Sequence, residues 1–198
     1  MEKLCEHIHL PFQSGSDRVL KAMHRGYTRE SYLERIERLK KVCPSIAITA
    51  DVIVGFPGEE EQDFKDTLDL MEKVKFDDLF SFKYSPRKGT RAAQLQNQVE
   101  EEVKQDRLSI LQTVQREITL QKNLALEGRV EEVLVEGLSK QSDQEMTGRT
   151  RSNKIVNFPG NMSLLGNLVP VRITKAYPHS LRGETVPLIA DCGIRKKI

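Results

Sequence analysis

The stretch Asp51-Val-Ile-Val-Gly-Phe-Pro-Gly-Glu59 contains residue types that suit ligand binding. The apolar run that ends at Val54 is dense enough for a parallel strand covered on both faces. Gly55 and Gly58 allow a sharp turn and a close approach of a ligand to the backbone, and Pro57 stiffens that turn. The carboxyl end of such a strand is the usual ligand site of α/β proteins. The sequence therefore predicts either a ligand-binding loop or a connector whose glycines serve only the turn.

Basic residues gather in the last third of the chain. Residues 129–198 contain 11 Lys and Arg against 7 Asp and Glu, which gives this part a net charge of +4. The first 128 residues contain 20 Lys and Arg against 22 Asp and Glu, which gives a net charge of −2. No acidic residue lies between Glu145 and Glu184. Since a solvated surface normally mixes signs, this stretch predicts a polyanionic partner, with nucleic acid favoured over chance clustering on a small basic barrel. Its cations are Arg149, Arg151, Lys154, Arg172, Lys175 and Arg182.

The elements that position the glycine loop alternate between strand and helix. Apolar spacing predicts a helix over residues 29–42 with Thr28 as its N-cap, and a second helix over residues 62–74. Strands are expected over residues 46–54 and 79–84. This order implies parallel crossovers, so the fold class is α/β, as in part of an open sheet or a barrel.

The spacing of apolar residues changes after a long predicted helix. That helix is predicted over residues 100–126, with acidic residues at its start and Gly128 as its C-terminal cap. Beyond it, apolar residues alternate with period two, which predicts a small antiparallel OB-like barrel of a kind that often binds nucleic acid. Arg172 and Thr174 fall on the outward face of the last predicted strand. The expected strands include residues 130–135, 154–158 and 168–176.

Composition excludes several classes of protein. The chain is 30% charged, has a mean hydropathy of −0.48 and contains no long apolar run or signal-peptide core, which predicts a cytoplasmic protein without a membrane span. Cys5, Cys43 and Cys192 have no disulfide or metal-ligand spacing. His9 is expected to be structural, with no cysteine or carboxylate near it, so no metal site is predicted. No hydrolase or phosphate-loop motif occurs.

Several segments together resemble one family. His9-Leu-Pro-Phe-Gln-Ser-Gly-Ser-Asp17, the motif from Asp51 to Glu59, and Tyr84-Ser-Pro-Arg-Lys-Gly-Thr-Arg-Ala92 look like the last three strand regions of a radical S-adenosylmethionine (radical SAM) barrel of the methylthiotransferase type. The tail, including Thr147-Gly-Arg-Thr150 and Val156-Asn-Phe158, is similar to the RNA-binding TRAM domain of that family. The resemblance implies a partial barrel in residues 1–128, a TRAM domain in residues 129–190 and a tail of residues 191–198.

The resemblance also implies roles for individual residues. Gln13 and Ser14 match the loop that approaches the ribose of SAM, although a serine turn before the helix that Ser16 or Asp17 caps is the alternative. The remaining residues that match the SAM site are Asp51, Ile53, Gly55, Tyr84 and Ser85. Ile53, taken alone, is expected in the barrel core, as is Phe158. The expected RNA contacts are Arg149, Arg151, Asn153, Lys154, Arg172 and Lys175, and Arg87, Lys88 and Arg91 either contact RNA or are solvated.

The chain departs from the family at its metal centres. Family members use SAM and two [4Fe-4S] clusters, but neither set of three cluster cysteines is present here. The resemblance therefore implies the C-terminal portion of a tRNA methylthiotransferase, which acts on N6-isopentenyladenosine beside the anticodon, and this portion is expected to be inactive without the N-terminal half. A stand-alone RNA-binding module and the ribosomal-protein branch of the family are the alternatives.

Overall fold

The computed structural model describes residues 4–140 and 142–187, except for the side chain of Asp143. It contains two compact units, Met1–Lys122 and Asn123–Ile198. Residues 188–190 of the expected TRAM domain, and the expected tail with Cys192, lie outside the described residues. Within the described parts of the chain, no helix combines the length and hydropathy needed to cross a membrane.

The first unit is built on a parallel sheet. Strands β1 (His7–His9), β2 (Ala47–Val54) and β3 (Asp78–Lys83) form a three-stranded sheet in the order β1-β2-β3. β2 pairs with both neighbours in parallel, with Ile53 opposite Phe82. The predicted α/β class with parallel crossovers is confirmed.

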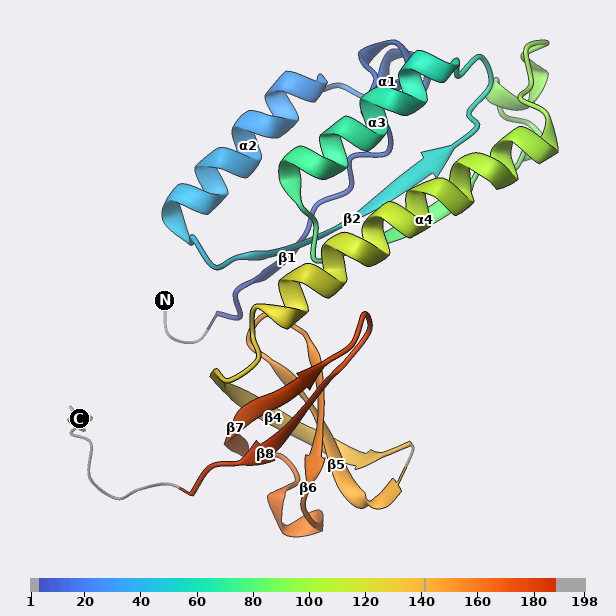
Figure 1. Ribbon diagram of the computed structural model, residues 1–198. Coiled ribbons are helices and arrows are strands. Elements are labelled where there is room, and N and C mark those ends of the chain that lie inside the picture. The colour runs from blue at the N-terminus through green and yellow to red at the C-terminus, as the bar shows by residue number, and fades with distance from the viewer. Residues whose placement is uncertain (1–3, 141, 188–198) are drawn as a thin grey trace. The chain divides into compact units, whose positions relative to one another are not determined.

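Helices fill the connections between these strands and follow the last one (Figure 1). Between β1 and β2 lie α1 (Asp17–Ala22) and α2 (Arg29–Val42), and between β2 and β3 lies α3 (Glu61–Val74). The short 3-10 helix η1 (Ala92–Gln94) and α4 (Glu101–Leu124) follow β3. The predicted N-cap of α2 is confirmed, because the Thr28 hydroxyl accepts the backbone N–H of Ser31 at 3.2 Å. The Ser16 hydroxyl accepts the Val19 N–H at the start of α1, which confirms Ser16 as a cap.

The core of this unit lies against one face of the sheet. Side chains of α2, α3 and α4 form one apolar cluster with the residues of β2 that point to them. Those fully buried residues are Ile48, Ala50, Val52 and Val54. The alternate residues Thr49, Asp51 and Ile53 are only half-buried. The expectation of a strand covered on both faces is wrong, as is the placement of Ile53 in the core, because the helices pack on the first face and leave the second partly open.

The second unit is a closed barrel with the strand order β4-β5-β6-β8-β7. Neighbouring strands are antiparallel except for β6 and β8. The strands are β4 (Val130–Ser139), β5 (Ser142–Thr150), β6 (Ile155–Pro159), β7 (Leu168–Ala176) and β8 (Leu181–Thr185), with the 3-10 helix η2 (Met162–Leu164) before β7. Phe158 is fully buried in the barrel, as expected. The predicted small OB-like barrel is confirmed.

Two strands of the barrel, β5 and β8, were not among the expected strands, because glycines interrupt the alternation of apolar and polar residues in them. In β8, Gly183 occupies an inward position, where a Cβ atom would lie 2.5 Å from Cγ1 of Val171. In β5, Gly148 also occupies an inward position, where a Cβ atom would lie 2.3 Å from the Leu134 carbonyl oxygen. Both strands therefore show little apolar periodicity although they complete the barrel.

Candidate cofactor and nucleic-acid sites

The loop that follows β2 adopts a backbone shape that favours glycine at two positions. Gly55 has a φ of 73° and Gly58 has a φ of 82°, in the left-handed region that other residues rarely adopt. A Cβ atom on Gly55 would lie 2.3 Å from Cγ of Lys104 in α4. Gly55 thus has a packing role, which the connector interpretation expects, and its predicted contact with a ligand remains a prediction.

The buried carboxylate of Glu59 holds this loop in place. Its Oε1 accepts hydrogen bonds from the backbone N–H of Gly55 and from Nη1 of Arg107, each at 2.8 Å. Burial raises the pKa of Glu59, although these two partners act in the opposite direction. The Arg107 guanidinium also lies over the ring of Phe64, 5.6 Å from its centroid. Sequence reasoning missed this pair, because nothing in the spacing links two residues 48 positions apart.

The second face of the sheet is the open one. Asp51 and Ile53 lie on this face of β2, directly opposite Phe80 and Phe82 of β3. Both phenylalanines are 53% exposed, which is high for side chains of this size. The ring of His9 packs edge-on against Phe80, with centroids 5.8 Å apart. The predicted residues Asp51 and Ile53 therefore lie on an accessible, partly apolar surface.

His9 has a carboxylate neighbour that the sequence did not reveal. Its Nε2 lies 3.4 Å from Oδ1 of Asp51, and its Nδ1 lies 3.0 Å from the Thr49 hydroxyl. The expectation that no carboxylate lies near His9 is wrong, because parallel pairing of β1 with β2 places His9 opposite Thr49, two residues from Asp51. Among residues 4–140 and 142–187, no group of three His, Cys, Asp or Glu side chains is arranged to hold a metal ion.

Gln13 and Ser14 lie beside the end of β2. Gln13 has a φ of 64°, and its backbone N–H and C=O pair with Asp51 and Ile53, each at 2.9 Å. Ser14 is 1% exposed, and its hydroxyl accepts the backbone N–H of Ser16 at 3.2 Å. This is the serine turn that the sequence offered as an alternative. It gives Ser14 a structural role, and contact of either residue with a ribose remains a prediction.

Tyr84 and Ser85 meet Ile53 in a cavity of about 480 Å³. The backbone N–H of Tyr84 donates to the Val54 carbonyl at 2.8 Å, which continues the pairing of β2 with β3. The Tyr84 hydroxyl is buried and has no hydrogen-bond partner among the described residues. A buried hydroxyl without a partner is rare and costly, so it is a candidate for binding a polar ligand atom. Other residues that line this cavity, and that sequence reasoning missed, are Phe82, Lys83, Thr90 and Ala92.

The expected RNA contacts lie in two places on the barrel. Arg149, Arg151, Asn153 and Lys154 lie in and beside the turn that joins β5 to β6, where Asn153 has a φ of 65°. The guanidinium of Arg149 donates from Nη1 to Oδ1 of Asn153 at 3.0 Å. The second group, Arg172 and Lys175, lies on the exposed side of β7. Its members also have local contacts: Arg172 donates to the Gly128 carbonyl at 3.0 Å, and Lys175 lies over the Tyr177 ring.

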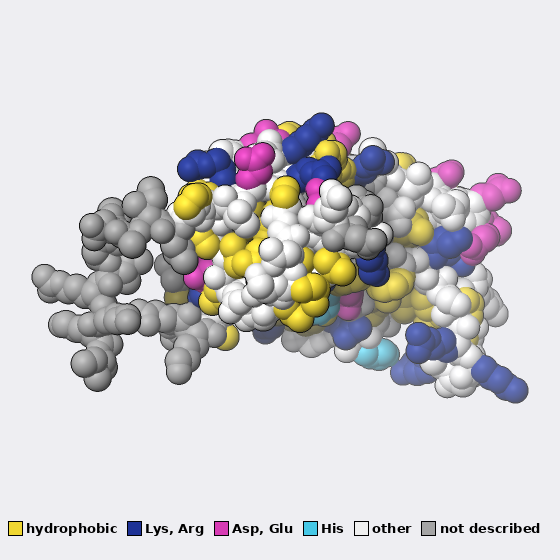
Figure 2. Space-filling view, turned by 90° about the horizontal axis from the view of Figure 1, so that it is seen from below, with side chains coloured by type: hydrophobic (Ala, Val, Ile, Leu, Met, Phe, Trp, Pro, Cys, Tyr) yellow, Lys and Arg dark blue, Asp and Glu magenta, His cyan; other side chains and the backbone are white. Residues whose placement is uncertain are grey.

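Carboxylates of β4 face several of these cations. Nε of Arg149 lies 3.3 Å from Oε2 of Glu136, and Nη1 of Arg151 lies 3.7 Å from Oε2 of Glu132. Arg182 is paired with Glu145. The stretch without acidic residues therefore does not form a surface of one sign, because antiparallel pairing brings the acidic residues of β4 beside the basic ones of β5. The polyanionic partner remains a prediction. On the face drawn in Figure 2, acidic and basic side chains lie near one another, and hydrophobic side chains are also exposed.

Comparison with known proteins matches both units. The model of the Radical SAM superfamily matches residues 1–71, and the model of the TRAM domain matches residues 124–186. Proteins named tRNA-2-methylthio-N(6)-dimethylallyladenosine synthase from Syntrophus aciditrophicus and Syntrophobacter fumaroxidans are 59% and 60% identical over 184 and 181 residues. These alignments cover 93% and 91% of this chain. A protein of the same name from Moorella thermoacetica is 53% identical over 94% of the chain. The chain spans 40 to 42% of the length of these relatives.

Proposed function

We propose that this chain, which belongs to the radical SAM methylthiotransferase family, is the C-terminal portion of a tRNA-modifying transferase. The complete enzyme would convert N6-isopentenyladenosine beside the anticodon of tRNA to its 2-methylthio derivative. The names of the relatives support the activity, and their greater length supports the interpretation as a portion. We also propose that residues 1–128 bind the cofactor and that residues 129–190 bind the RNA. A tRNA substrate would place the enzyme in the cytoplasm.

The observation that carries the SAM assignment is the cavity at the strand ends. Ile53 lines this cavity and offers an apolar surface to an adenine ring. Gly55 belongs to the proposed set through the loop that follows the same strand, although its Cα packs against Lys104. The buried hydroxyl of Tyr84 offers a hydrogen bond that no described residue satisfies. Gln13, Ser14, Asp51 and Ser85 complete the proposed set around the same strand ends. SAM, when bound, supplies the methyl group and the radical precursor of this class of reaction.

Iron-sulfur clusters do not fit the residues of this chain. The described residues contain no group of three or more His, Cys, Asp or Glu side chains that could hold a metal ion, and Cys5 and Cys43 are free thiols. Three thiolates would have to converge to hold such a cluster. The complete enzyme would therefore bind both [4Fe-4S] clusters through other segments, and no step proposed for this chain involves one.

The barrel is the proposed tRNA contact. The TRAM match and the cations of β7 and of the turn between β5 and β6 support binding of a phosphate backbone. Arg149, Arg151, Asn153, Lys154, Arg172 and Lys175 form the proposed set. Since Arg149 and Arg151 have carboxylate neighbours, Arg172 and Lys175 would contribute more of the affinity.

The decisive test is the nucleoside composition of tRNA in the source cell. Deletion of the gene that encodes this chain should abolish 2-methylthio-N6-isopentenyladenosine and cause the unmethylthiolated precursor to accumulate, as measured by liquid chromatography and mass spectrometry. Unchanged levels of both nucleosides would exclude the proposed function. In that case, retained tRNA binding by the purified chain would favour a stand-alone RNA-binding module. Loss of methylthiolation from a ribosomal protein would favour the other branch of the family.

A further inference from the structure

A second, larger cavity lies at the same strand ends. It has a volume of about 630 Å³ and lies between the C-terminal end of α1 and the loop after β3. Ile53 and Tyr84 line it as well as the smaller cavity. We propose that this cavity receives one nucleotide of the substrate RNA and that Arg25 and Arg91 bind its phosphate groups. The inference rests on the proposed function and deepens it by assigning residues that hold the RNA beside the SAM site.

The walls of the cavity suit a nucleobase. Met23, Ile53, Phe56 and Leu95 give it an apolar lining. A base has two flat apolar faces and a polar edge, so it needs such walls together with a few hydrogen-bonding groups. Tyr84 is a lining residue, and its hydroxyl is buried without a hydrogen-bond partner among the described residues. The volume lies within the range of about 300 to 1,000 Å³ that is usual for sites of small molecules.

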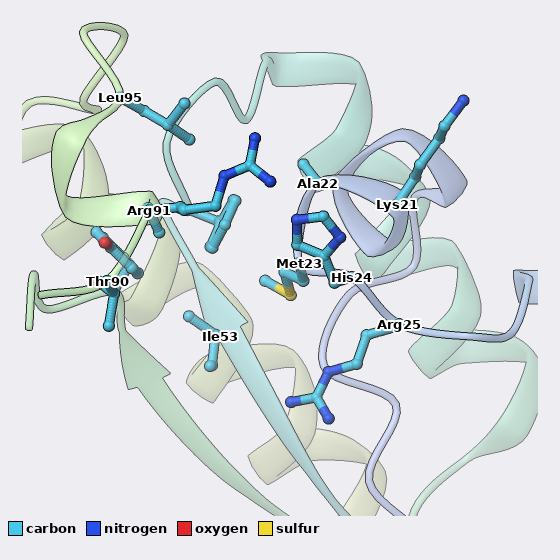
Figure 3. Close-up of a pocket in the computed structure, with 12 residues that line it drawn as sticks. Lys21, Ala22, Met23, His24, Arg25, Ile53, Thr90, Arg91 and Leu95 are labelled. Carbon is cyan, nitrogen blue, oxygen red and sulfur yellow. The ribbon is translucent and has the colours of Figure 1, made fainter.

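Two arginines lie on opposite sides of the opening. Figure 3 shows Arg91 extending from the loop after β3, and His24 and Arg25 extending from the segment after α1. Arg25 and Arg91 are exposed and form no ion pair with any residue that the structure describes. Arg18 and Arg29, which flank the same segment, are instead paired with Asp63 and Asp69. Two guanidiniums without an ion pair to a described residue thus lie at the cavity, where they can bind phosphate through paired N–H groups.

The backbone after α1 is arranged to place Arg25 there. His24 has a φ of 57°, in the left-handed region that a residue other than glycine seldom adopts. Its N–H donates to the Lys21 carbonyl at 3.0 Å, and the N–H of Arg25 donates to the Leu20 carbonyl at 2.9 Å. These bonds close the helix and reverse the chain, so that residues 23–25 line the cavity. The two bonds form a Schellman motif, which commonly ends a helix at a left-handed residue.

The placement of the two cations favours RNA over SAM as their ligand. A nucleotide within a chain has a phosphate on each side, and this cavity has a guanidinium on each side. SAM carries one carboxylate and would use only one of them. The proposed occupant is therefore a nucleotide flanked by two phosphates, for which adenosine 3′,5′-bisphosphate is a soluble probe.

The test uses the ¹⁵N-labelled 198-residue chain titrated with this bisphosphate and with adenosine. The backbone amide signals of Met23, His24 and Leu95, which line this cavity and not the smaller one, report on the proposed nucleotide site. The bisphosphate should bind at least about tenfold more tightly than adenosine. The Arg25→Gln, Arg91→Gln double variant should lose most of this difference. The matched control is the Lys41→Gln, Arg116→Gln double variant, which removes the same charge from exposed positions of the same unit and should bind like the unchanged chain.

Three results would overturn the inference. One is the absence of any shift of these amide signals with the bisphosphate. Another is equal affinity of the cavity variant and the control variant. The third is that the cavity variant loses affinity for S-adenosylhomocysteine but not for the bisphosphate, which would make the arginines part of the SAM site. None of these results alters the tRNA nucleoside test, so failure of the inference and failure of the proposed function are separable.

Discussion

Nη1 of Arg107 lies 2.8 Å from Oε1 of Glu59, and their side chains are only 9% and 2% exposed. A charge this deeply buried is stable only with its partner, since water cannot solvate it after the partner is removed. Because Oε1 of Glu59 also accepts the Gly55 N–H, the pair links α4 to the loop that carries the proposed SAM contacts. The stability of the fold and the shape of the site therefore depend on the same interaction.

The first prediction is that Glu59→Ala lowers the free energy of unfolding by about 3 to 5 kcal/mol. The change would leave the Arg107 guanidinium buried without its carboxylate. Urea denaturation followed by circular dichroism would measure the loss. Glu61→Ala is the control, because the Glu61 side chain is 66% exposed and lies 3.8 Å from Arg107. Equal effects of the two changes would contradict the importance of the buried pair.

The second prediction separates two effects of replacing a glycine by alanine: the strain of a positive φ and the steric overlap of the new Cβ atom. Gly55→Ala should lower the free energy of unfolding by more than Gly89→Ala, which should cost about 1 kcal/mol. Both residues have a positive φ, of 73° and 87°. Only at Gly55 would the new Cβ atom meet Lys104, at 2.3 Å, whereas nothing lies within 4 Å of the position at Gly89. Thermal unfolding of the two variants gives the comparison, and equal losses would show that Lys104 moves aside freely.

The third prediction concerns pH. Burial alone would raise the pKa of Asp63, but hydrogen bonds from Arg18, from the Ser16 hydroxyl and from the Glu60 amide lower it below its ordinary value of 3.8. A lowered carboxyl pKa contributes stability that is fully present above pH 3.8 and is lost as pH falls through the folded-state pKa. The difference in unfolding free energy between the unchanged chain and Asp63→Asn should therefore shrink at low pH. Urea titrations between about pH 3 and 6 would measure it, and a constant difference would disprove the linkage.

The fourth prediction tests the unpartnered hydroxyl of Tyr84. Tyr84→Phe should leave the free energy of unfolding unchanged or raise it, because no hydrogen bond is lost. The same change should weaken binding of S-adenosylhomocysteine about fivefold or more, by calorimetry, if the hydroxyl contacts the ligand. Tyr32→Phe is the matched control. Its hydroxyl donates to the Leu10 carbonyl at 2.7 Å, so that change should cost about 1 kcal/mol of stability.

The sequence predicted most of the first unit, because apolar spacing and caps are local signals. Thr28 and the stripe of α2 illustrate this, since the cap and the helix need only neighbouring residues. What the sequence could not predict depends on pairing across the chain. The contact of His9 with Asp51 requires the register of β1 on β2. Whether both faces of β2 are covered depends on where the helices pack. The pattern of apolar residues within one strand does not show on which face of the sheet they will pack.

The barrel shows the same limit for charge. A run of residues without acids predicted a basic surface, but the surface depends on which strands are neighbours. Glu132 and Glu136 of β4 lie beside Arg151 and Arg149 although they are far from them in sequence. The roles of Arg149 and Arg151 in RNA binding therefore depend on how strongly these carboxylates compete with phosphate.

The fifth prediction measures that competition. The Glu132→Gln, Glu136→Gln double variant should bind single-stranded RNA several-fold more tightly than the unchanged chain at low salt, because it removes the two carboxylates that compete with phosphate for Arg149 and Arg151. It should also show a steeper loss of affinity as salt increases, since each added phosphate contact releases about one counterion. Fluorescence anisotropy at a series of salt concentrations would measure both quantities.

The control for this prediction is the Glu37→Gln, Glu72→Gln double variant, which makes the same change in net charge at exposed positions of the first unit. If it tightens RNA binding equally, the effect comes from overall charge and the two carboxylates of β4 have no special role. If neither variant changes the affinity, Arg149 and Arg151 do not contact RNA. Binding would then depend on Arg172 and Lys175, whose replacement by alanine should reduce both the affinity and its dependence on salt.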